Sequence, residues 1–427
     1  MKNITFKTLA LATAIAGITS QVQADYDISF NGYGRMGAGY SSDDPVQGEK
    51  KNGINVIKAP ESQYPAPGRL GNEKYGFEVG VNNKFTSDNG QVLDVYFMLE
   101  DWSQNQDEQG FPQAFVRASN VFDSQPGASV WAGKRHLGRT YMWQNDYFYL
   151  LNDGTGAGIE NLNMGGALLD SALVAGGTGN NNRYGFINKI HGIQLSDSVD
   201  MAINLNYGFA ADDDESTESK WVVTEATKEL SPDQYLYEKE TTTTKPENGH
   251  QLAFNIGQNW SMGRNELHVR SSRGFRHGMM WGNADKDLKS LMFGLRGNID
   301  FSSKFGVHYN FLHETNKDMT DDGAAIADET LTQLVVTPVY KHSDIHSTRL
   351  EVGIDSLKFD DLSTTKGDTN KAWRVGLEHA IQLNSFGWPS PTLKFFVNHG
   401  EVTEAYELTK SDKRDATTIG AMMEASW

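Results

Sequence analysis

Hydrophobic and polar residues alternate along most of the chain, so that every second side chain is apolar. In residues 349–355, Leu350, Val352 and Ile354 alternate with charged residues and a glycine. Successive side chains of a β-strand point to opposite faces, so this period predicts strands with one apolar and one polar face. The same pattern is clear in residues 251–257, 305–311 and 373–378. Counted along the chain, it predicts about 18 strands.

Two architectures place an apolar and a polar face on every strand: a soluble β-sandwich and a membrane β-barrel. Three features favour the barrel. The apolar face is rich in Leu, Phe, Val and Tyr, short turns such as 88–90 and 300–303 alternate with long polar loops, and the last predicted strand, 419–427, ends in the aromatic Trp427. The predicted fold class is therefore all-β, an antiparallel transmembrane β-barrel with long extracellular loops and short periplasmic turns.

Long polar segments separate pairs of predicted strands. They cover about 41–68, 103–112, 210–249, 314–330 and 358–371. The segment 210–249 is acidic at 212–215 and carries a threonine run at 241–244. Such a composition is typical of solvated surface loops, and we interpret it as surface solubility rather than as calcium binding.

The first 24 residues have the features of a secretory signal peptide. Lys2 and Lys7 form a basic start, residues 9–18 form an apolar core, and Val22-Gln23-Ala24 provides a small-x-small cleavage site. The segment is too short and wrongly flanked for a transmembrane helix. We therefore expect export, removal of residues 1–24, and a single barrel domain over residues 25–427.

Composition excludes several classes of protein. There is no cysteine, so an exported chain of this kind is not a disulfide-stapled domain. The formal net charge of −17 disfavours nucleic-acid binding, which needs a clustered basic surface. After the signal segment no run of roughly 18 apolar residues remains, which excludes helical membrane spans. The mean hydropathy of −0.53 fits a barrel, because half of each strand is polar.

No catalytic or cofactor motif stands out. The chain lacks HExxH, GxSxG and P-loop patterns, and its 11 histidines show no close metal-ligand spacing. The glycine-rich run 154–158 lacks the βαβ context of a dinucleotide site. We therefore expect neither an enzyme nor a bound cofactor or metal.

The polar faces of the strands are the candidates for function, because in a barrel they line the lumen. In the first strand Ile28, Phe30 and Met36 share one parity, whereas Tyr33 and Arg35 share the other. A tyrosine ring stacks on the apolar face of a pyranose, and a guanidinium donates hydrogen bonds to ring hydroxyls. Two interpretations stay open. Either Tyr33 and Arg35 bind a sugar together, or Arg35 only contributes positive charge to the wall of a pore.

Further motifs occur in a fixed order along the chain. They are Phe30–Arg35 (FNGYGR), Arg69–Glu73 (RLGNE), Trp131–Arg135 (WAGKR), Gly156–Leu162 (GAGIENL), Trp388–Pro391 (WPSP) and Gly420–Glu424 (GAMME). From its first mature strand to its last, the chain resembles the maltoporin family of trimeric sugar-specific porins. The resemblance implies an 18-stranded homotrimeric barrel in the outer membrane of a Gram-negative bacterium. Its surroundings would be outer-membrane lipid and lipopolysaccharide, and its third loop would fold inward to narrow the pore.

The resemblance also implies a function, which is facilitated diffusion of maltose and maltodextrins along an aromatic path flanked by a polar track. The aromatic path would comprise Tyr33, Trp102, Phe148 and Trp388, with Trp102 serving the pore of the neighbouring subunit. The polar track would comprise Arg35, Arg69, Glu78, Arg117, Arg139 and Asp146. At two positions where the family has polar-track residues, this chain has Tyr141 and Trp143, which would lie at the constriction.

Some positions depart from the family pattern. The slide tyrosine of the second strand falls on Gly76, and by parity Tyr75 and Phe77 are expected to face lipid. Phe148 lacks the hydroxyl of the constriction tyrosine, and the slide phenylalanine near 264–267 has no aromatic counterpart. These departures keep open a porin for another oligosaccharide, such as sucrose, a β-glucoside or a chitooligosaccharide. A general diffusion porin remains open too, as does an outer-membrane adhesin, which the long acidic loop suggests.

Overall fold

The structure is a computed structural model, and it describes most of the chain. The described residues are 25–41, 46, 50, 52–73, 75–102, 110–176, 183–210, 216–223, 237–244, 248–278, 285–321, 324–325, 327–360, 369–382, 391–407 and 410–427. The predicted signal peptide, residues 1–24, lies outside them. So do Trp388 and most of the loops predicted at 103–112 and 358–371.

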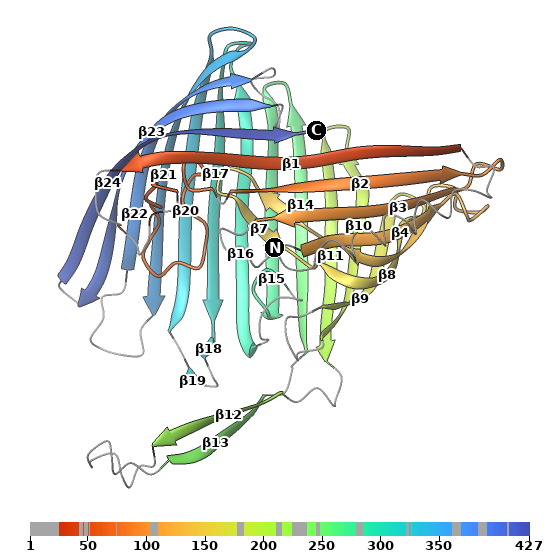
Figure 1. Ribbon diagram of the computed structural model, residues 1–427, viewed down its shortest axis with the longest axis horizontal. Coiled ribbons are helices and arrows are strands. Elements are labelled where there is room, and N and C mark those ends of the chain that lie inside the picture. Colours follow the sequence, from red (N-terminus) through yellow and green to blue (C-terminus); the bar gives the residue numbers. More distant parts are fainter. Residues whose placement is uncertain are drawn as a thin grey trace, which may run out of the picture.

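Eighteen strands form one closed antiparallel sheet, as Figure 1 shows. They are β1 (Asp25–Ser41), β2 (Gly76–Thr86), β3 (Val92–Asp101), β4 (Gly110–Ser119), β5 (Ser129–Arg135), β8 (Gly154–Asn163), β9 (Leu168–Gly176), β10 (Arg183–Ser196), β11 (Val199–Ala210), β14 (Gly249–Trp260), β15 (Gly263–Gly274), β16 (Asp285–Asp300), β17 (Phe305–Lys317), β20 (Asp328–Lys341), β21 (His346–Asp360), β22 (Thr369–Gln382), β23 (Thr392–Glu407) and β24 (Lys410–Ser426). Each strand pairs with the next barrel strand along the chain, and β24 pairs with β1 to close the sheet. The prediction of an 18-stranded barrel is confirmed.

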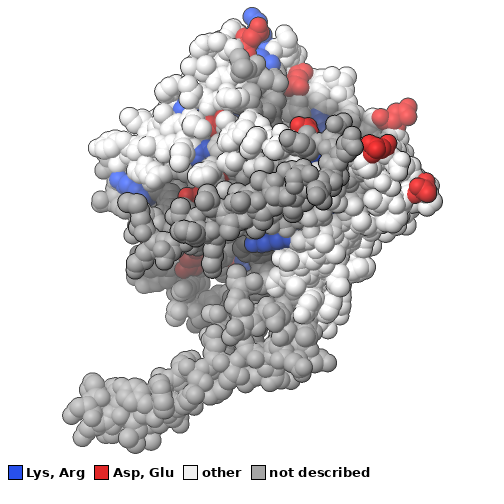
Figure 2. Space-filling model, turned by 45° about the vertical axis from the view of Figure 1, so that its right-hand side comes forward, with Lys and Arg blue, Asp and Glu red and all other residues white. Residues whose placement is uncertain are grey.

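The two faces of this sheet are opposite in character. On β22 the side chains of Trp373 and Leu377 are 40% and 48% exposed on the outside, whereas the inward Arg374 and Glu378 are 1% and 4% exposed. Figure 2 shows uncharged residues over most of the visible described wall, with charged side chains scattered among them. An apolar outer surface around a polar interior is the arrangement of a membrane barrel and the inverse of a soluble sandwich.

Three short hairpins of the described residues lie outside the barrel sheet. They are β6 (Thr140–Met142) with β7 (Tyr147–Leu150), β12 (Ser216–Val223) with β13 (Tyr237–Thr244), and β18 (Thr320–Asp321) with β19 (Ala324–Ala325). The pair β12–β13 belongs to the acidic loop predicted at 210–249 and stands away from the barrel in Figure 1. In the described part of the chain, no helix has the length and apolar character that a membrane crossing requires.

The first long loop folds into the barrel. Within residues 52–73, Ala59, Tyr64 and Leu70 are 0%, 4% and 3% exposed. Side chains of the barrel wall hydrogen-bond to the backbone of this loop, and they are Gln333, Glu351, Asp355, Asn370, Arg374 and Asn398. These bonds satisfy backbone groups that would otherwise be buried without partners. The resemblance implied an inward fold for the third loop alone. Strand parity carries no information about loops, so the inward first loop was not expected.

Tyr75 lies inside the barrel, so the prediction that it faces lipid is wrong. Its side chain is 7% exposed and belongs to a buried cluster that includes Leu70 and Phe396. The parity of the second strand does not extend to Tyr75, because β2 begins at Gly76 and Tyr75 precedes it at the end of the inward-folded loop. Phe77, which lies within β2, is 39% exposed on the outer face, as predicted.

The attachment of the first loop to the barrel wall can be tested with Arg374→Met. Arg374 Nη1 donates to the carbonyl of Gly68 (2.7 Å) and lies 3.2 Å from Oε1 of Glu351. Removing one partner of a buried ion pair leaves the other charge uncompensated, so we expect a loss of about 3–5 kcal/mol in the free energy of unfolding. Denaturant titration of the folded barrel in detergent measures this loss.

Lys371→Met is the matched control for that experiment. Lys371 lies on the same strand but is exposed, so its replacement should change the free energy of unfolding by no more than about 0.5 kcal/mol. Equal unfolding midpoints for the Arg374 variant and the wild type would contradict the claim that Arg374 stabilises the fold by holding the first loop.

Candidate functional site

Residues 136–153, here called the constriction loop, join β5 to β8 and carry the hairpin β6–β7 inside the barrel. Side chains fix this loop to the wall. Gln144 Nε2 donates to the carbonyl of Tyr309 (2.8 Å), and Arg270 Nη1 donates to the carbonyl of Tyr149 (2.8 Å). The third outer loop therefore folds inward, as the resemblance implied.

Asp146 joins the tip of the constriction loop to the wall at β1. Arg35 donates to both carboxylate oxygens, from Nη1 to Oδ1 at 2.9 Å and from Nη2 to Oδ2 at 2.5 Å. The Tyr141 hydroxyl also donates to Oδ1. Asp146 has a φ of 58°, a left-handed conformation in which Asp is enriched relative to most residues. The residue type thus suits both the turn and the ion pair.

The pairing with Arg35 fixes the charge of Asp146. Burial raises the pKa of this carboxyl, but the charge and hydrogen bonds of Arg35 outweigh burial and hold that pKa below its ordinary 3.8. A carboxyl with a lowered pKa contributes stability above its ordinary pKa and loses it as the pH falls through the lowered value. The Arg35–Asp146 pair therefore stays charged at neutral and mildly acidic pH.

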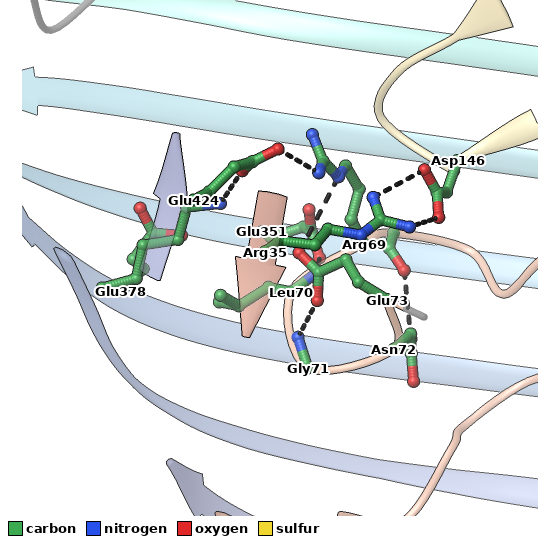
Figure 3. Close-up of polar contacts among 12 residues, drawn as sticks. Arg35, Arg69, Leu70, Gly71, Asn72, Glu73, Asp146, Glu351, Glu378 and Glu424 are labelled. Carbon is green, nitrogen blue, oxygen red and sulfur yellow. Dashed lines mark hydrogen bonds and ion pairs between the residues drawn. The ribbon is translucent and has the colours of Figure 1, made fainter. Parts of the chain in front are cut away.

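Glu424 on β24 is a second carboxylate beside this pair. It accepts hydrogen bonds from Arg69 (2.6 Å) and from Lys394 Nζ (2.6 Å). Figure 3 shows the guanidinium groups of Arg35 and Arg69 close together, with Asp146 on one side and Glu424 on the other. We call these five charged residues the ion network. All of them except Asp146 are less than a tenth exposed. Buried charges of this kind are stable only when each is paired with an opposite charge.

Tyr33 and Trp102 form an aromatic pair beside the ion network. Their rings stack with centroids 5.8 Å apart and 28° between the planes. Trp102 Nε1 donates to Glu78 Oε1 (2.9 Å), and the Arg35 guanidinium lies 5.1 Å from the Trp102 ring centroid. The Tyr33 hydroxyl donates to Glu424 (2.5 Å), which ties the aromatic pair to the ion network.

Trp102 occupies the space of the side chain that Gly76 lacks. A Cβ on Gly76 would lie 2.7 Å from Cα and 2.8 Å from Cε3 of Trp102. An aromatic ring is therefore present where the second strand supplies none. Within the single chain, the Trp102 ring lies against Tyr33.

A second aromatic pair lies on the constriction loop itself. The rings of Tyr141 and Phe148 have centroids 4.6 Å apart. The guanidinium of Arg139 lies 5.3 Å from the Phe148 centroid and is paired with Asp153. A cation held near an aromatic face in this way stabilises the orientation of the ring.

Three candidate residues remain, and they are Arg117, Trp143 and Trp388. Arg117 on β4 is paired with Asp94 on β3 (Nη2–Oδ2 2.9 Å) and not with a member of the ion network. Trp143 lies on the constriction loop with its ring edge against His308, and Trp388 lies outside the described residues. In the described part of the chain, no group of three or more His, Asp or Glu side chains could hold a metal ion.

The sequence interpretation missed Glu424 and Lys394 as members of the site. Glu424 shares the inward parity of Met422, and Lys394 shares that of Asn398. Parity therefore placed both on the lumen face. It marks every lumen-facing residue alike, however, and does not reveal which of them meet the first loop.

Comparisons with known proteins agree with this architecture. The family model described as LamB porin matches residues 28–427. The maltoporin of Hahella chejuensis (strain KCTC 2396) is 27% identical over 99% of this chain and 98% of its own length. Among solved structures, OmpT of Vibrio cholerae in its trimer form is 10% identical and covers 94% of this chain and 99% of its own, with a TM-score of 0.44. The channel DcaP of Acinetobacter baumannii is also 10% identical, covers 94% and 97%, and has a TM-score of 0.46. Because both scores are below 0.5, the family match and the maltoporin relative carry the assignment.

The packing of Trp102 against Gly76 can be tested with Gly76→Ala. The added Cβ would lie 2.2 Å from the carbonyl oxygen of Asp101, so the backbone or Trp102 must shift. We expect the free energy of unfolding to fall by about 1–3 kcal/mol, the usual cost of overpacking. Gly127→Ala is the control, since its Cβ would have no heavy atom within 4 Å. Equal stabilities of the two variants would show that Trp102 does not fill this space.

Proposed function

Because the chain belongs to the LamB porin family, we propose that it is an outer-membrane channel through which maltose and maltodextrins diffuse down their gradient. The family and the closed barrel make it an outer-membrane porin and a channel rather than an enzyme. The proposal adds the sugar and the manner of its movement.

The observation that carries the proposal is the placement of two aromatic pairs beside the ion network. Tyr33 and Trp102 lie on one side, and Tyr141 and Phe148 lie on the constriction loop, which Asp146 ties to the wall at β1. Aromatic rings bind the C–H faces of pyranoses, and charged groups exchange hydrogen bonds with their hydroxyls. Each aromatic contact contributes on the order of 1 kcal/mol, so a sugar is held weakly and keeps moving, as conduction requires.

Trp102 supports an aromatic path through the lumen. Gly76 supplies no ring to the second strand, but the ring of Trp102 packs over Gly76 and stacks on Tyr33. The runner-up is a porin for another oligosaccharide. It is favoured by Arg264, which stands near the position of the missing slide phenylalanine and carries a guanidinium paired with Asp200 and Glu266.

Assembly and export complete the proposal. The exposed apolar side chains of β1 and its neighbours, such as Phe30 at 64% and Met36 at 56%, suit either lipid or a second subunit, and we assign the protein a trimeric state as in its family. Residues 1–24 are removed as a signal peptide, which leaves 25–427 as the barrel. Lipopolysaccharide surrounds its outer rim.

The sugar can be identified by recording ion current through the protein in a planar bilayer while maltooligosaccharides are added. We expect saturable block by maltotriose and maltohexaose. Trp102→Ala should weaken that block about 2- to 10-fold, the loss of one aromatic contact. Trp373→Ala, on the outer face, should leave it unchanged. Block only by another class of sugar would support the runner-up, and the absence of block by any sugar would refute a sugar-specific channel.

Phe148→Ala tests whether this ring lines the narrowest part of the pore. Removing a ring that borders the passage widens it, so the single-channel conductance without sugar should rise. Phe395→Ala is the control, because Phe395 is 51% exposed on the outer face. An unchanged conductance in the Phe148 variant would remove that residue from the pore lining.

A further inference from the structure

Three histidines gather at the short-turn end of β20, β21 and β22, and we call them the histidine cluster. His342 begins the turn between β20 and β21, His346 begins β21, and His379 lies near the end of β22. The backbone N–H of His342 donates to the carbonyl of His346 (2.9 Å), which sets these two residues opposite each other. The N–H of Gln382 donates to the carbonyl of Ile345 (2.8 Å), so the end of β22 lies against the same turn.

The histidine cluster lies on the outer face of the barrel. His379 has the strand parity of the outward Trp373, and His346 has that of the outward Leu350. Residues that lie directly opposite across a strand pair share a face, so His342 lies on the outside as well. His342 is exposed, and His346 and His379 are partly exposed. An ion dissolved in water can therefore reach the cluster without entering the lumen.

The ring nitrogens of His346 and His379 face each other. Nδ1 of His346 lies 3.1 Å from Nε2 of His379, and the ring centroids are 5.3 Å apart with 30° between the planes. Two imidazole nitrogens that bind one ion at about 2.0–2.1 Å lie about 2.9 Å apart in a square-planar arrangement and about 3.4 Å apart in a tetrahedral one. The observed spacing lies between these values. An ion can therefore replace the hydrogen that the two nitrogens share, after a small tilt of each ring.

His342 borders this pair and holds its own ring in place. Its Nε2 lies 2.8 Å from the hydroxyl of Thr348, and its ring centroid lies 6.0 Å from that of His379. The ring of Tyr340 meets His342 edge-on, with centroids 5.2 Å apart. Because its Nε2 is bonded to Thr348, His342 forms a wall beside the pair, and water fills the remaining coordination positions of an ion bound there.

We propose that His346 and His379 form a binding site for one divalent transition-metal ion, Cu²⁺ or Zn²⁺, at the short-turn rim of the barrel. Imidazole is the commonest protein ligand for such ions, and a site of this kind binds Cu²⁺ more tightly than Zn²⁺. Ca²⁺ and Mg²⁺ are disfavoured, because they prefer oxygen ligands. The bound ion would join β21 to β22 beside the turn. This site does not depend on the sugar path.

The spacing of histidines along the chain does not reveal this pair, because its members are 33 positions apart on different strands. Two imidazoles also fall short of the three protein ligands that are absent as a group from the described part of the chain. A site with two protein ligands exchanges its ion readily, and its affinity depends on both of them.

The test is titration of the folded barrel in detergent with Cu²⁺, followed by electron paramagnetic resonance, and with Zn²⁺, followed by calorimetry. The wild type should bind Cu²⁺ with the spectral signature of two equatorial nitrogens. His346→Ala and His379→Ala should each remove that signature and weaken the affinity at least about 10-fold, since the loss of even an outer-shell partner of a metal ligand costs about 10- to 100-fold.

His399→Ala is the matched control. His399 is exposed on the outer face of β23, and its Nδ1 lies 2.9 Å from the hydroxyl of Thr417, so its replacement should leave the affinity unchanged. Unchanged affinity in His346→Ala and His379→Ala refutes the site, as does an equal loss in His399→Ala, which would show non-specific binding to imidazole. A tenfold loss in His342→Ala would overturn the assignment of two ligands. If an alanine variant fails to fold, His379→Gln carries the test, and wild-type affinity in His379→Gln refutes the site.

Discussion

The ion network at the constriction is the interaction on which the arrangement of the lumen depends. Its charges come from β1, β23, β24, the first loop and the constriction loop, which are far apart in the sequence. Breaking a buried ion pair costs about 3–5 kcal/mol, because the remaining charge stays uncompensated. Glu424 therefore holds Arg69 and with it the first loop, while Arg35 holds Asp146 at the tip of the constriction loop. Both inward-folded loops are therefore held at the ion network, and the two aromatic pairs lie beside it.

The closed sheet makes this interior possible. In lipid every backbone group must be satisfied within the protein, and a barrel achieves this because β24 pairs with β1 and leaves no edge. Its outer face is mainly apolar, so most of the polar side chains of the strands point inward. A wide lumen of this kind would be an unselective pore. The two inward loops, 52–73 and 136–153, convert it into a structured passage because wall side chains bind their backbones.

The sequence predicted those features of the structure that strand parity and the order of the motifs determine. The period of two identified the barrel and its faces, and the family resemblance identified Arg35, Arg69 and Asp146, which the structure brings together. Parity failed for Tyr75, because that residue precedes its strand. Parity could predict neither the inward fold of the first loop nor the packing of Trp102 against Gly76, since both are set by contacts between distant segments. The sequence showed only that Gly76 has no side chain, whereas the structure shows Trp102 packed where such a side chain would lie.

The central claim is that a sugar moves through this barrel along rings held beside the ion network. A structure of the assembled protein with maltohexaose bound tests it most directly. The account predicts sugar rings stacked on Tyr33 and Trp102 of the same subunit, with hydroxyls in contact with Arg69 and Glu424. Sugar bound away from these residues, or Trp102 seated in a neighbouring pore, would contradict it.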